Sequence, residues 1–282
     1  MTAQPTILIT GAHGLLGPYL VEAASRRGRV VGLSRTCGEV RCDLADWPAA
    51  EAAVRETRPD IVLHAAAMTD VDACEREPRL ADRANRLATA NLVATLPVAS
   101  RLVMFSTDQV YPNTPGPHRE GDEGPVNAYG RSKLASEDEA LCHPGALVLR
   151  TNFFGPTRTP GRRSLSDFVA DNLAAGQPIT LFRDVLFSPL HMATLAELTF
   201  TAIEQELAGV YNCGCCHGMS KLDFGLTVAA HLGLSTDAAT AGDSTARASR
   251  ALRGLDLRMD VGRFERALHR SMPSLKEEIA KL

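Results

Sequence analysis

Short runs of β-branched and apolar residues alternate with longer segments of helical periodicity over the first 152 residues of this chain. Strands that alternate with helices form βαβ units, so the alternation predicts an α/β fold built on a doubly wound parallel sheet. The apolar run IVLHAAA suits a sheet that helices cover on both faces. The predicted strands cover residues 6–10, 29–35, 40–44, 60–67, 101–107 and 146–152, and the predicted helices cover 14–28, 47–58, 79–96 and 128–142.

Three glycines, Gly11, Gly14 and Gly17 in TILITGAHGLLG, lie directly between a predicted strand and a predicted helix. The chain must turn tightly here, and the amino end of the helix offers N–H donors and partial positive charge to a pyrophosphate. A glycine triple in this context indicates the phosphate loop of a Rossmann dinucleotide-binding domain. A plain strand-to-helix turn is the alternative interpretation.

The pattern becomes less regular after residue 152. SKLD, at 220–223, has the sequence of a capping box that opens a helix. The polar, small-residue stretch 235–250 predicts a mobile loop. We therefore expect an NAD(P)-binding domain at residues 1–152 and mainly a smaller substrate-binding lobe at 153–282, with some segments returning to the first domain. The other elements predicted after residue 152 are helices at 166–175 and 193–206 and strands at 179–182 and 209–214.

The end of the second predicted strand bears on which dinucleotide binds. LSRT has no acidic residue to accept a hydrogen bond from an adenosine ribose 2′-hydroxyl, and it carries Ser34 and Arg35 instead. An arginine at this place can bind a 2′-phosphate, so the sequence favours NADPH, with NADH and a merely solvated arginine as alternatives. Asp43 closes the third strand, where it could contact the adenine ring or cap the next helix.

Tyr129 and Lys133 are four residues apart in a predicted helix, so their side chains point the same way. A free phenol has a pKa near ~10, and a neighbouring ammonium favours its ionised form, so we expect Lys133 to lower the pKa of Tyr129. Ser106 and Thr107 end a predicted strand close to the expected nicotinamide position and could hold a substrate oxygen. A solvated helix face is the alternative for each residue taken alone.

Together these segments resemble the extended short-chain dehydrogenase/reductases, and within them the dTDP-4-dehydrorhamnose reductase family. TGAHGLLG is similar to the cofactor loop of that family, and CDLAD is similar to its adenine-side acidic segment. Four further segments resemble family motifs, and the resemblance runs over nearly the whole chain. These segments are RPDIVLHAAAMTDVDACEREP, FSTDQVY, REGDEGPVNAYGRSKLASE and LRTNFFG.

The resemblance implies a reaction and a role for individual residues. Tyr129 would be the general acid, Lys133 its partner, and Thr107 the third member of the triad. The implied reaction is hydride transfer from NADPH to the C4 ketone of a nucleotide-linked 4-keto-6-deoxy sugar, with Tyr129 protonating the emerging alkoxide. The expected cofactor-binding residues are Gly11, His13, Gly14, Leu15, Leu16, Gly17, Ser34, Arg35, Asp43, Leu44, Ala65, Ala66, Ala67, Asn85, Thr151, Asn152 and Phe153.

The sequence departs from the family pattern on the substrate side. RGLDLRMDVGRF has Gly254 where the family has proline, and Leu257 where the family has serine. The sugar and the nucleotide are therefore left open by the sequence. The candidate substrate residues are Asp108, Val110, Arg162, Asp184 and Arg253.

Two other functions stay open at this point. The family also resembles the regulatory subunit of methionine adenosyltransferase, which keeps the fold and the cofactor groove but acts through a partner. An epimerase or dehydratase is the other alternative, although Asp108 is not followed by the glutamate usual in dehydratases. The presence of Thr107, Tyr129 and Lys133 favours a reductase, and a homodimer is left open.

Composition excludes several partners. The net charge of −3 gives no basic footprint for nucleic acid. No apolar run reaches the roughly 18 residues of a membrane span, and the first residues lack a basic signal region, so we expect a cytoplasmic protein. The seven cysteines include three in CGCC at 213–216, but no second cluster has zinc spacing. We expect reduced thiols and no metal.

Overall fold

The computed structural model describes residues 4–246 and 251–282. Within them a seven-stranded sheet has the order β11-β6-β5-β4-β1-β2-β3, and every neighbouring pair is parallel. The predicted doubly wound sheet is therefore confirmed. Its strands are β1 (Thr6–Thr10), β2 (Arg29–Ser34), β3 (Val40–Arg41), β4 (Ile61–His64), β5 (Arg101–Thr107), β6 (Leu147–Thr151) and β11 (Gly209–Cys213).

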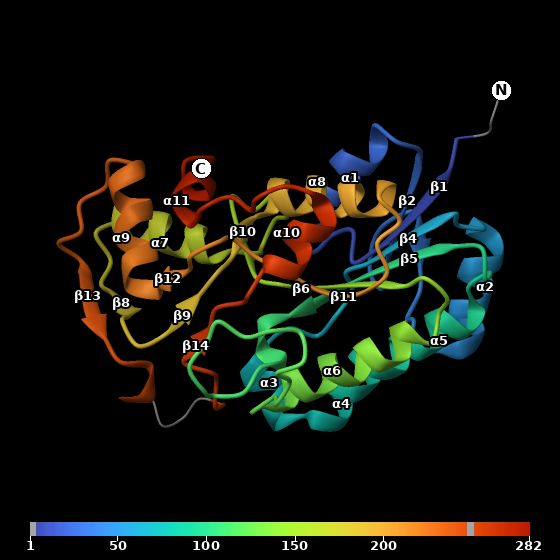
Figure 1. Ribbon diagram of the computed structural model, residues 1–282, viewed down its shortest axis with the longest axis horizontal. Coiled ribbons are helices and arrows are strands. Elements are labelled where there is room, and N and C mark those ends of the chain that lie inside the picture. Colours follow the sequence, from blue (N-terminus) through green and yellow to red (C-terminus); the bar gives the residue numbers. More distant parts are fainter. Residues whose placement is uncertain (1–3, 247–250) are drawn as a thin grey trace.

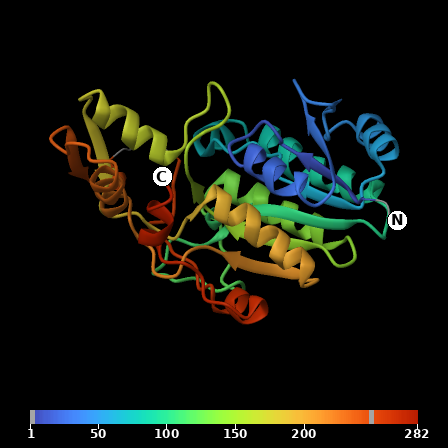
Figure 2. The same ribbon diagram turned by 90° about the horizontal axis from the view of Figure 1, so that it is seen from above.

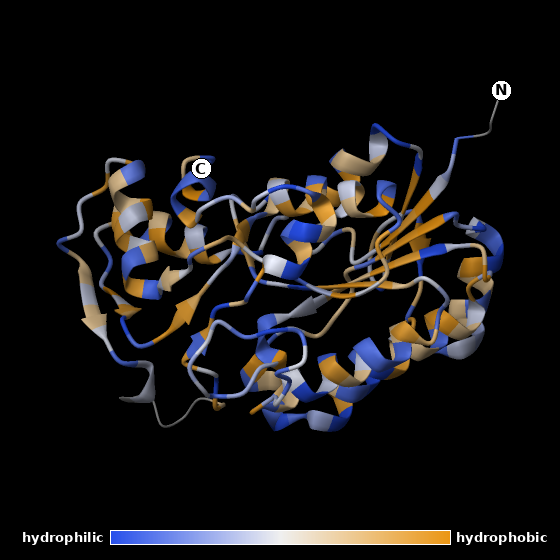
Figure 3. Cartoon of the chain, in the orientation of Figure 1, coloured by the Kyte–Doolittle hydropathy of each residue, from blue (hydrophilic) through white to orange (hydrophobic). Residues whose placement is uncertain are grey.

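Helices cover both faces of this sheet (Figure 1). The reason lies in the period of a strand, which turns successive side chains to opposite faces. Ile7 and Ile9 of β1 pack in one core with α1 and α8, and Leu8 packs in a second core with α2 and α5. The strands accordingly form a hydrophobic layer between the helices (Figure 3). These helices are α1 (Gly17–Ser25), α8 (Met192–Glu204), α2 (Trp47–Thr57), α5 (Ala88–Thr95) and α6 (Ala128–Leu141).

The second half of the chain builds a smaller group of helices and short strands beside the sheet (Figure 2). Its strand β11 nevertheless pairs with β6 inside the main sheet, so this half of the chain contributes to both parts. The division of the chain at residue 152 stays a prediction. The elements here are β7 (Phe153–Phe154), α7 (Leu165–Ala174), β8 (Ile179–Phe182), β9 (Leu186–Phe187), β10 (Leu190–His191), β12 (Met219–Ser220), α9 (Lys221–His231), β13 (Ala239–Gly242), β14 (Asp256–Leu257), α10 (Gly262–Leu268) and α11 (Leu275–Ile279).

The mobile loop predicted at 235–250 is wrong for part of that range. Residues Ala239–Gly242 form β13, which pairs in parallel with β8. Small side chains let the segment lie flat on the edge of β8, and the Thr240 hydroxyl donates to the Ile179 carbonyl at 3.1 Å. A short 3₁₀ helix follows at Ser244–Ala246, and residues 247–250 lie outside the described part of the chain.

The long helix predicted at 79–96 is confirmed as an uninterrupted helical stretch, but it contains a π-helical segment that was not predicted. The structure divides it into α4 (Pro78–Asp82), a π-helical segment η1 (Arg83–Leu87) and α5, and it adds α3 (Val71–Arg76) before them. The π-helical segment contains Asn85, which is turned inward against the chain that follows β4. Periodicity over 18 residues does not reveal such a local widening, which is typical of functional regions.

The predicted capping box at SKLD forms only in part. The Ser220 hydroxyl accepts the Asp223 backbone N–H at 3.0 Å, as expected of an N-cap. The Asp223 carboxylate accepts from the Ser220 hydroxyl at 2.7 Å, and only the serine half of the motif is made. Among the described residues, no helix has both the length and the apolar character that crossing a membrane requires.

Candidate active site

A cleft of about 590 Å³ opens at the carboxyl ends of four strands. Gly11 follows β1, Ala65 follows β4, Thr107 ends β5 and Asn152 follows β6, and all four residues line it. This is the edge at which open α/β sheets bind their ligands. Its volume falls within the range of about 300–1,000 Å³ that is usual for ligand pockets.

The glycine loop forms the floor of one end of the cleft. Gly11 has a φ of +71°, and a Cβ there would lie 2.8 Å from the Ala66 backbone nitrogen. A Cβ on Gly17 would lie only 2.2 Å from the Ala12 carbonyl oxygen. The first turn of α1 has no side-chain cap, so its amino end can serve an anion in the cleft.

Nearly all of the cofactor residues predicted from the sequence line this cleft. Asn85 does not: it is 1% exposed, accepts from the Met68 N–H at 2.7 Å and donates to the Met68 carbonyl at 3.1 Å. It therefore fixes the backbone that follows β4 instead of facing a ligand. Those that do line the cleft are Gly11, His13, Gly14, Leu15, Leu16, Gly17, Ser34, Arg35, Asp43, Leu44, Ala65, Ala66, Ala67, Thr151, Asn152 and Phe153.

The end of the cleft beyond β2 carries Ser34 and an exposed Arg35. The Ser34 hydroxyl accepts the Cys37 N–H at 3.0 Å, which shapes the turn after the strand. Asp43 lines the cleft too, and its carboxylate accepts from the Ala45 N–H at 3.1 Å. The alternative that Asp43 caps the next helix is wrong, because Asp46 occupies the N-cap position of α2.

The three predicted catalytic residues meet in the cleft. Asn127 caps α6 by accepting the Gly130 N–H at 2.8 Å, and this start places Tyr129 and Lys133 one turn apart on the cleft side. Thr107, at the end of β5, is hydrogen bonded to the Tyr129 phenol. The Lys133 ammonium donates to the Phe105 carbonyl at 2.8 Å.

The expectation that Lys133 lowers the pKa of Tyr129 is wrong for this structure. Burial raises the pKa of Tyr129, and the hydrogen bond with Thr107 opposes this effect without cancelling it. Tyr129 is 8% exposed, and the neighbouring Asp108 carboxylate raises its pKa further. A phenol in this environment keeps its proton at neutral pH, which is the state that a general acid needs.

Lys133 is itself buried, and burial lowers its pKa to about 8. Close to it, His64 of β4 is 1% exposed and lies between the hydroxyl oxygens of Thr10 and Thr89, at 2.8 and 3.0 Å. Burial and the charge of Lys133 lower the pKa of His64 to about 3. His64 is therefore a neutral hydrogen-bonding residue of the core.

This histidine predicts a loss of stability in acid. The unfolded chain binds a proton at His64 below about pH 6.5, whereas the folded protein does not until about pH 3, so the contribution of His64 is complete above pH 6.5 and is lost as the pH falls. Between pH 7 and 5 the free energy of unfolding should fall by about 2 kcal/mol more in the wild type than in His64→Gln. Urea unfolding at both pH values measures this difference. Exposed His231→Gln is the control, and equal falls in the wild type and His64→Gln would contradict the account.

Of the five candidate substrate residues, the structure brings Asp108, Arg162 and Arg253 into the cleft. The Asp108 carboxylate is 1% exposed and accepts from the Asn152 amide at 2.7 Å. Burial raises the pKa of Asp108, and the Asn152 hydrogen bond and the charge of Lys221 oppose this. Arg253 pairs with Asp72 at 3.0 Å at the cleft wall.

The prediction that Val110 and Asp184 bind substrate is not supported, because neither residue lines the cleft. Val110 is fully buried and packs with Tyr111 and Met259. Asp184 accepts from the Ser244 N–H and hydroxyl at 2.9 Å and so holds the turn after β13. Motif register alone predicted these two residues, and it does not tell which way a side chain turns.

Sequence reasoning missed several residues of the cleft. Lys221 is the clearest case, because it is one of only four lysines in the chain and directly follows the N-cap Ser220 of α9. Because lysine is rare in this chain, its presence at residue 221 was a signal in the sequence that could have indicated a functional residue. Other missed lining residues are Thr36, Met68, Thr69 and Gln109.

The cysteines form no site in the described part of the chain. All seven are unpaired there, and burial raises the pKa of Cys213 and Cys215. Among the residues at 4–246 and 251–282, no three His, Cys, Asp or Glu side chains come together as a metal ion would require.

Comparisons with known proteins show the family to which the chain belongs. The family model described as "RmlD substrate binding domain" matches residues 5–282. A relative named "Probable low-salt glycan biosynthesis reductase", from Haloferax volcanii, is 30% identical over 97% of this chain and 96% of its own length. The dTDP-4-dehydrorhamnose reductase of Mycolicibacterium smegmatis is 37% identical over 74% of this chain and 64% of its own.

A solved structure shows the same fold. The dTDP-4-dehydrorhamnose reductase of Bacillus anthracis, crystallised in complex with NADP, superposes with a TM-score of 0.89. The match covers 99% of this chain and 98% of that one, at 24% identity.

Proposed function

The chain belongs to the RmlD substrate-binding-domain family, and from this premise we propose that it is an NADPH-dependent reductase of a nucleotide-linked 4-keto-6-deoxy sugar. One observation carries the proposal: Thr107, Tyr129 and Lys133 line the same cleft as the glycine loop. Relatives named dTDP-4-dehydrorhamnose reductase support both the substrate class and the direction of the reaction. A homodimer is part of the proposal, to be measured by light scattering.

The donors along the cleft fit a dinucleotide. The uncapped amino end of α1 suits a pyrophosphate, and Arg35 beyond β2 suits a 2′-phosphate. When bound, NADPH supplies the hydride that reduces the substrate ketone. Lys133 is a compact donor on the cleft wall, which suits ribose hydroxyls better than a planar guanidinium would.

The side chains of the triad supply and direct a proton. Tyr129 keeps its phenolic proton at neutral pH and would donate it to the alkoxide that forms on the substrate. An alkoxide is a far stronger base than a phenolate, so a raised pKa of Tyr129 does not prevent this transfer. Thr107 would hold the same substrate oxygen, and the ammonium of Lys133 would stabilise the phenolate left after transfer.

The position of Arg35 leads us to predict that this residue makes the protein bind NADPH more tightly than NADH. Arg35→Ala should raise the Kd of NADPH by about 10–100-fold, because the charge-assisted hydrogen bonds to a phosphate are lost. The Kd of NADH should stay within about twofold, since NADH has no 2′-phosphate. Nicotinamide fluorescence titrations measure both constants. Arg41→Ala, at the exposed end of β3, is the matched control, and an equal loss for both cofactors would refute this role.

The function is tested by following NADPH absorbance in the presence of freshly prepared dTDP-4-keto-6-deoxy sugar. Substrate-dependent oxidation supports the reductase. Tight NADPH binding without oxidation, repeated with UDP- and GDP-linked 4-keto sugars, would reject the reductase and leave the regulatory-subunit alternative. Rearrangement of the sugar without net NADPH consumption would identify an epimerase instead.

A further inference from the structure

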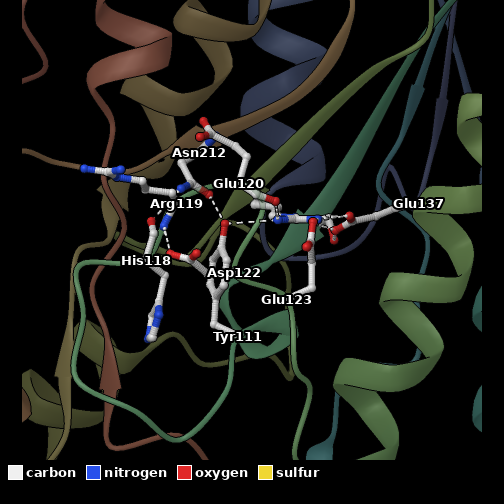
Figure 4. A network of polar contacts seen from close by, with 10 residues as sticks. Tyr111, His118, Arg119, Glu120, Asp122, Glu123, Glu137 and Asn212 are labelled. Carbon is white, nitrogen blue, oxygen red and sulfur yellow. Dashed lines mark hydrogen bonds and ion pairs between the residues drawn. The ribbon is translucent and has the colours of Figure 1, made fainter.

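Arg150 of β6 is buried and is held by several polar side chains, among them those of Tyr111, Glu123 and Glu137, which Figure 4 labels. Arg150 and Glu137 are each 1% exposed. The Arg150 Nε lies 3.1 Å from both carboxylate oxygens of Glu137, and its Nη2 donates to Oε2 at 2.7 Å. A buried ion pair adds little net stability compared with apolar packing, so its presence calls for another reason.

The remaining donors of Arg150 are also used. Its Nη1 donates to the Glu120 carbonyl at 2.7 Å and to the Tyr111 hydroxyl at 3.1 Å. Its Nη2 forms a second ion pair with Glu123, at 2.6 Å. The guanidinium is therefore held from several sides, and it in turn holds the Glu137 carboxylate in one orientation.

Glu137 connects this buried group to the catalytic residues. Its Oε1 accepts a hydrogen bond from the hydroxyl of Ser106, which lines the cleft next to Thr107. Glu137 also lies one helical turn after Lys133 on α6, so the two side chains share a face of the helix. Lys133 donates to the carbonyl of Phe105, directly before Ser106.

We propose that Glu137 is a positioning residue of the reductase site: its carboxylate, oriented by Arg150, fixes the Ser106 end of β5 and keeps Lys133 charged. The proposal rests on the proposed function for its catalytic consequence. Its electrostatic part concerns the protein alone and can be tested without a substrate.

The charges around Lys133 support this assignment. Burial lowers the pKa of Lys133 to about 8, and the negative charge of Glu137 acts in the opposite direction. Without that charge the pKa of Lys133 would be lower still, and a larger fraction of the ammonium would lose its proton near neutral pH. Ionisable groups on the surrounding elements include Tyr129 on α6, His64 on β4, Asp108 on η2 (Asp108–Val110), Cys74 on α3 and Arg150 on β6, whereas Arg86 of η1 is engaged by Asp82 and Glu139.

The first measurement is the titration of Lys133 by NMR. With ¹³Cε-labelled lysine the four lysines give few signals, and Lys133→Met identifies the buried one. In Glu137→Gln, which keeps the size of the side chain and one of its two acceptor oxygens, the midpoint of Lys133 should fall by about one pH unit or more. Glu137→Asp keeps the charge and should restore the midpoint to near the wild-type value. Glu123→Gln removes the other carboxylate on Arg150 and should leave the Lys133 midpoint unchanged.

The second measurement is the pH dependence of kcat. The alkaline limb in Glu137→Gln should move to lower pH by the same amount as the Lys133 midpoint, whereas a merely structural role would lower kcat equally at every pH. An unchanged Lys133 midpoint in folded Glu137→Gln would overturn the proposal. If the wild type reduces no sugar, the proposed function fails while the NMR titration still decides the electrostatic role of Glu137.

A second variant covers the case in which the uncompensated arginine prevents folding. Glu137→Gln combined with Arg150→Gln removes both charges and leaves amides that can hydrogen bond. Because the charge of Glu137 acts on the pKa of Lys133, whereas that of Arg150 is not among the causes of its shift, the midpoint should still move downward, by less than in the single variant. A midpoint equal to that of the wild type would again overturn the proposal.

Discussion

Tyr129→Phe should lower kcat by on the order of 10²–10⁴-fold, the usual contribution of a general acid. Phenylalanine keeps the buried ring and removes only the proton that the substrate alkoxide would take. The Kd of NADPH should stay within about threefold of the wild-type value, because the substitution leaves the glycine loop and Arg35 unaltered. Steady-state kinetics and fluorescence titration on one protein preparation separate the two effects.

Tyr211→Phe is the matched control for this prediction. Tyr211 is 9% exposed, belongs to β11 and packs against Phe264, so it loses the same hydroxyl at a buried site away from the cleft. Its kcat should equal that of the wild type. A Tyr129→Phe enzyme that kept kcat within a factor of ten would remove Tyr129 from the role of general acid.

Gly17→Ala should destabilise the protein and abolish tight NADPH binding. The added Cβ would lie 2.2 Å from the Ala12 carbonyl oxygen and 2.5 Å from that of Gly11, and these atoms belong to the backbone of the cofactor loop. Forcing them apart should lower the free energy of unfolding by about 1–3 kcal/mol. The moved loop should raise the Kd of NADPH at least about tenfold. Urea unfolding and fluorescence titration measure the two quantities.

Gly121→Ala is the control for the glycine prediction. No atom lies within 4 Å of the Cβ position at Gly121, so both quantities should match those of the wild type. If Gly17→Ala bound NADPH as tightly as Gly121→Ala, the close packing of the loop would have no role in cofactor binding.

Much of the fold could be predicted because its signals are local. Most of the predicted strands in the first 152 residues are compact apolar runs, and the parallel sheet follows from the helices between them. The glycine loop and the Tyr129 and Lys133 pair were found for the same reason: each depends on residues that are close in sequence. The structure places both in one cleft, as the family resemblance implied.

What could not be predicted depends on contacts between distant segments. Asn85 turns inward because the backbone at Met68 offers it both a donor and an acceptor. The strand β13 exists because the edge of β8 lies beside it. The pKa of Tyr129 depends on how deeply α6 is buried, and a neighbouring lysine in the sequence says nothing about that burial.

The most direct test of the central claim is the fate of the hydride. The reaction should be run with NADPH carrying two deuterium atoms at nicotinamide C4, so that transfer from either face delivers deuterium, and the sugar product examined by mass spectrometry and NMR. A reductase of 4-keto sugars predicts one deuterium per product molecule, bound at C4 of the sugar, and far less product when Tyr129→Phe replaces the wild type under the same conditions. A product without deuterium, or with deuterium at another carbon, would contradict the account.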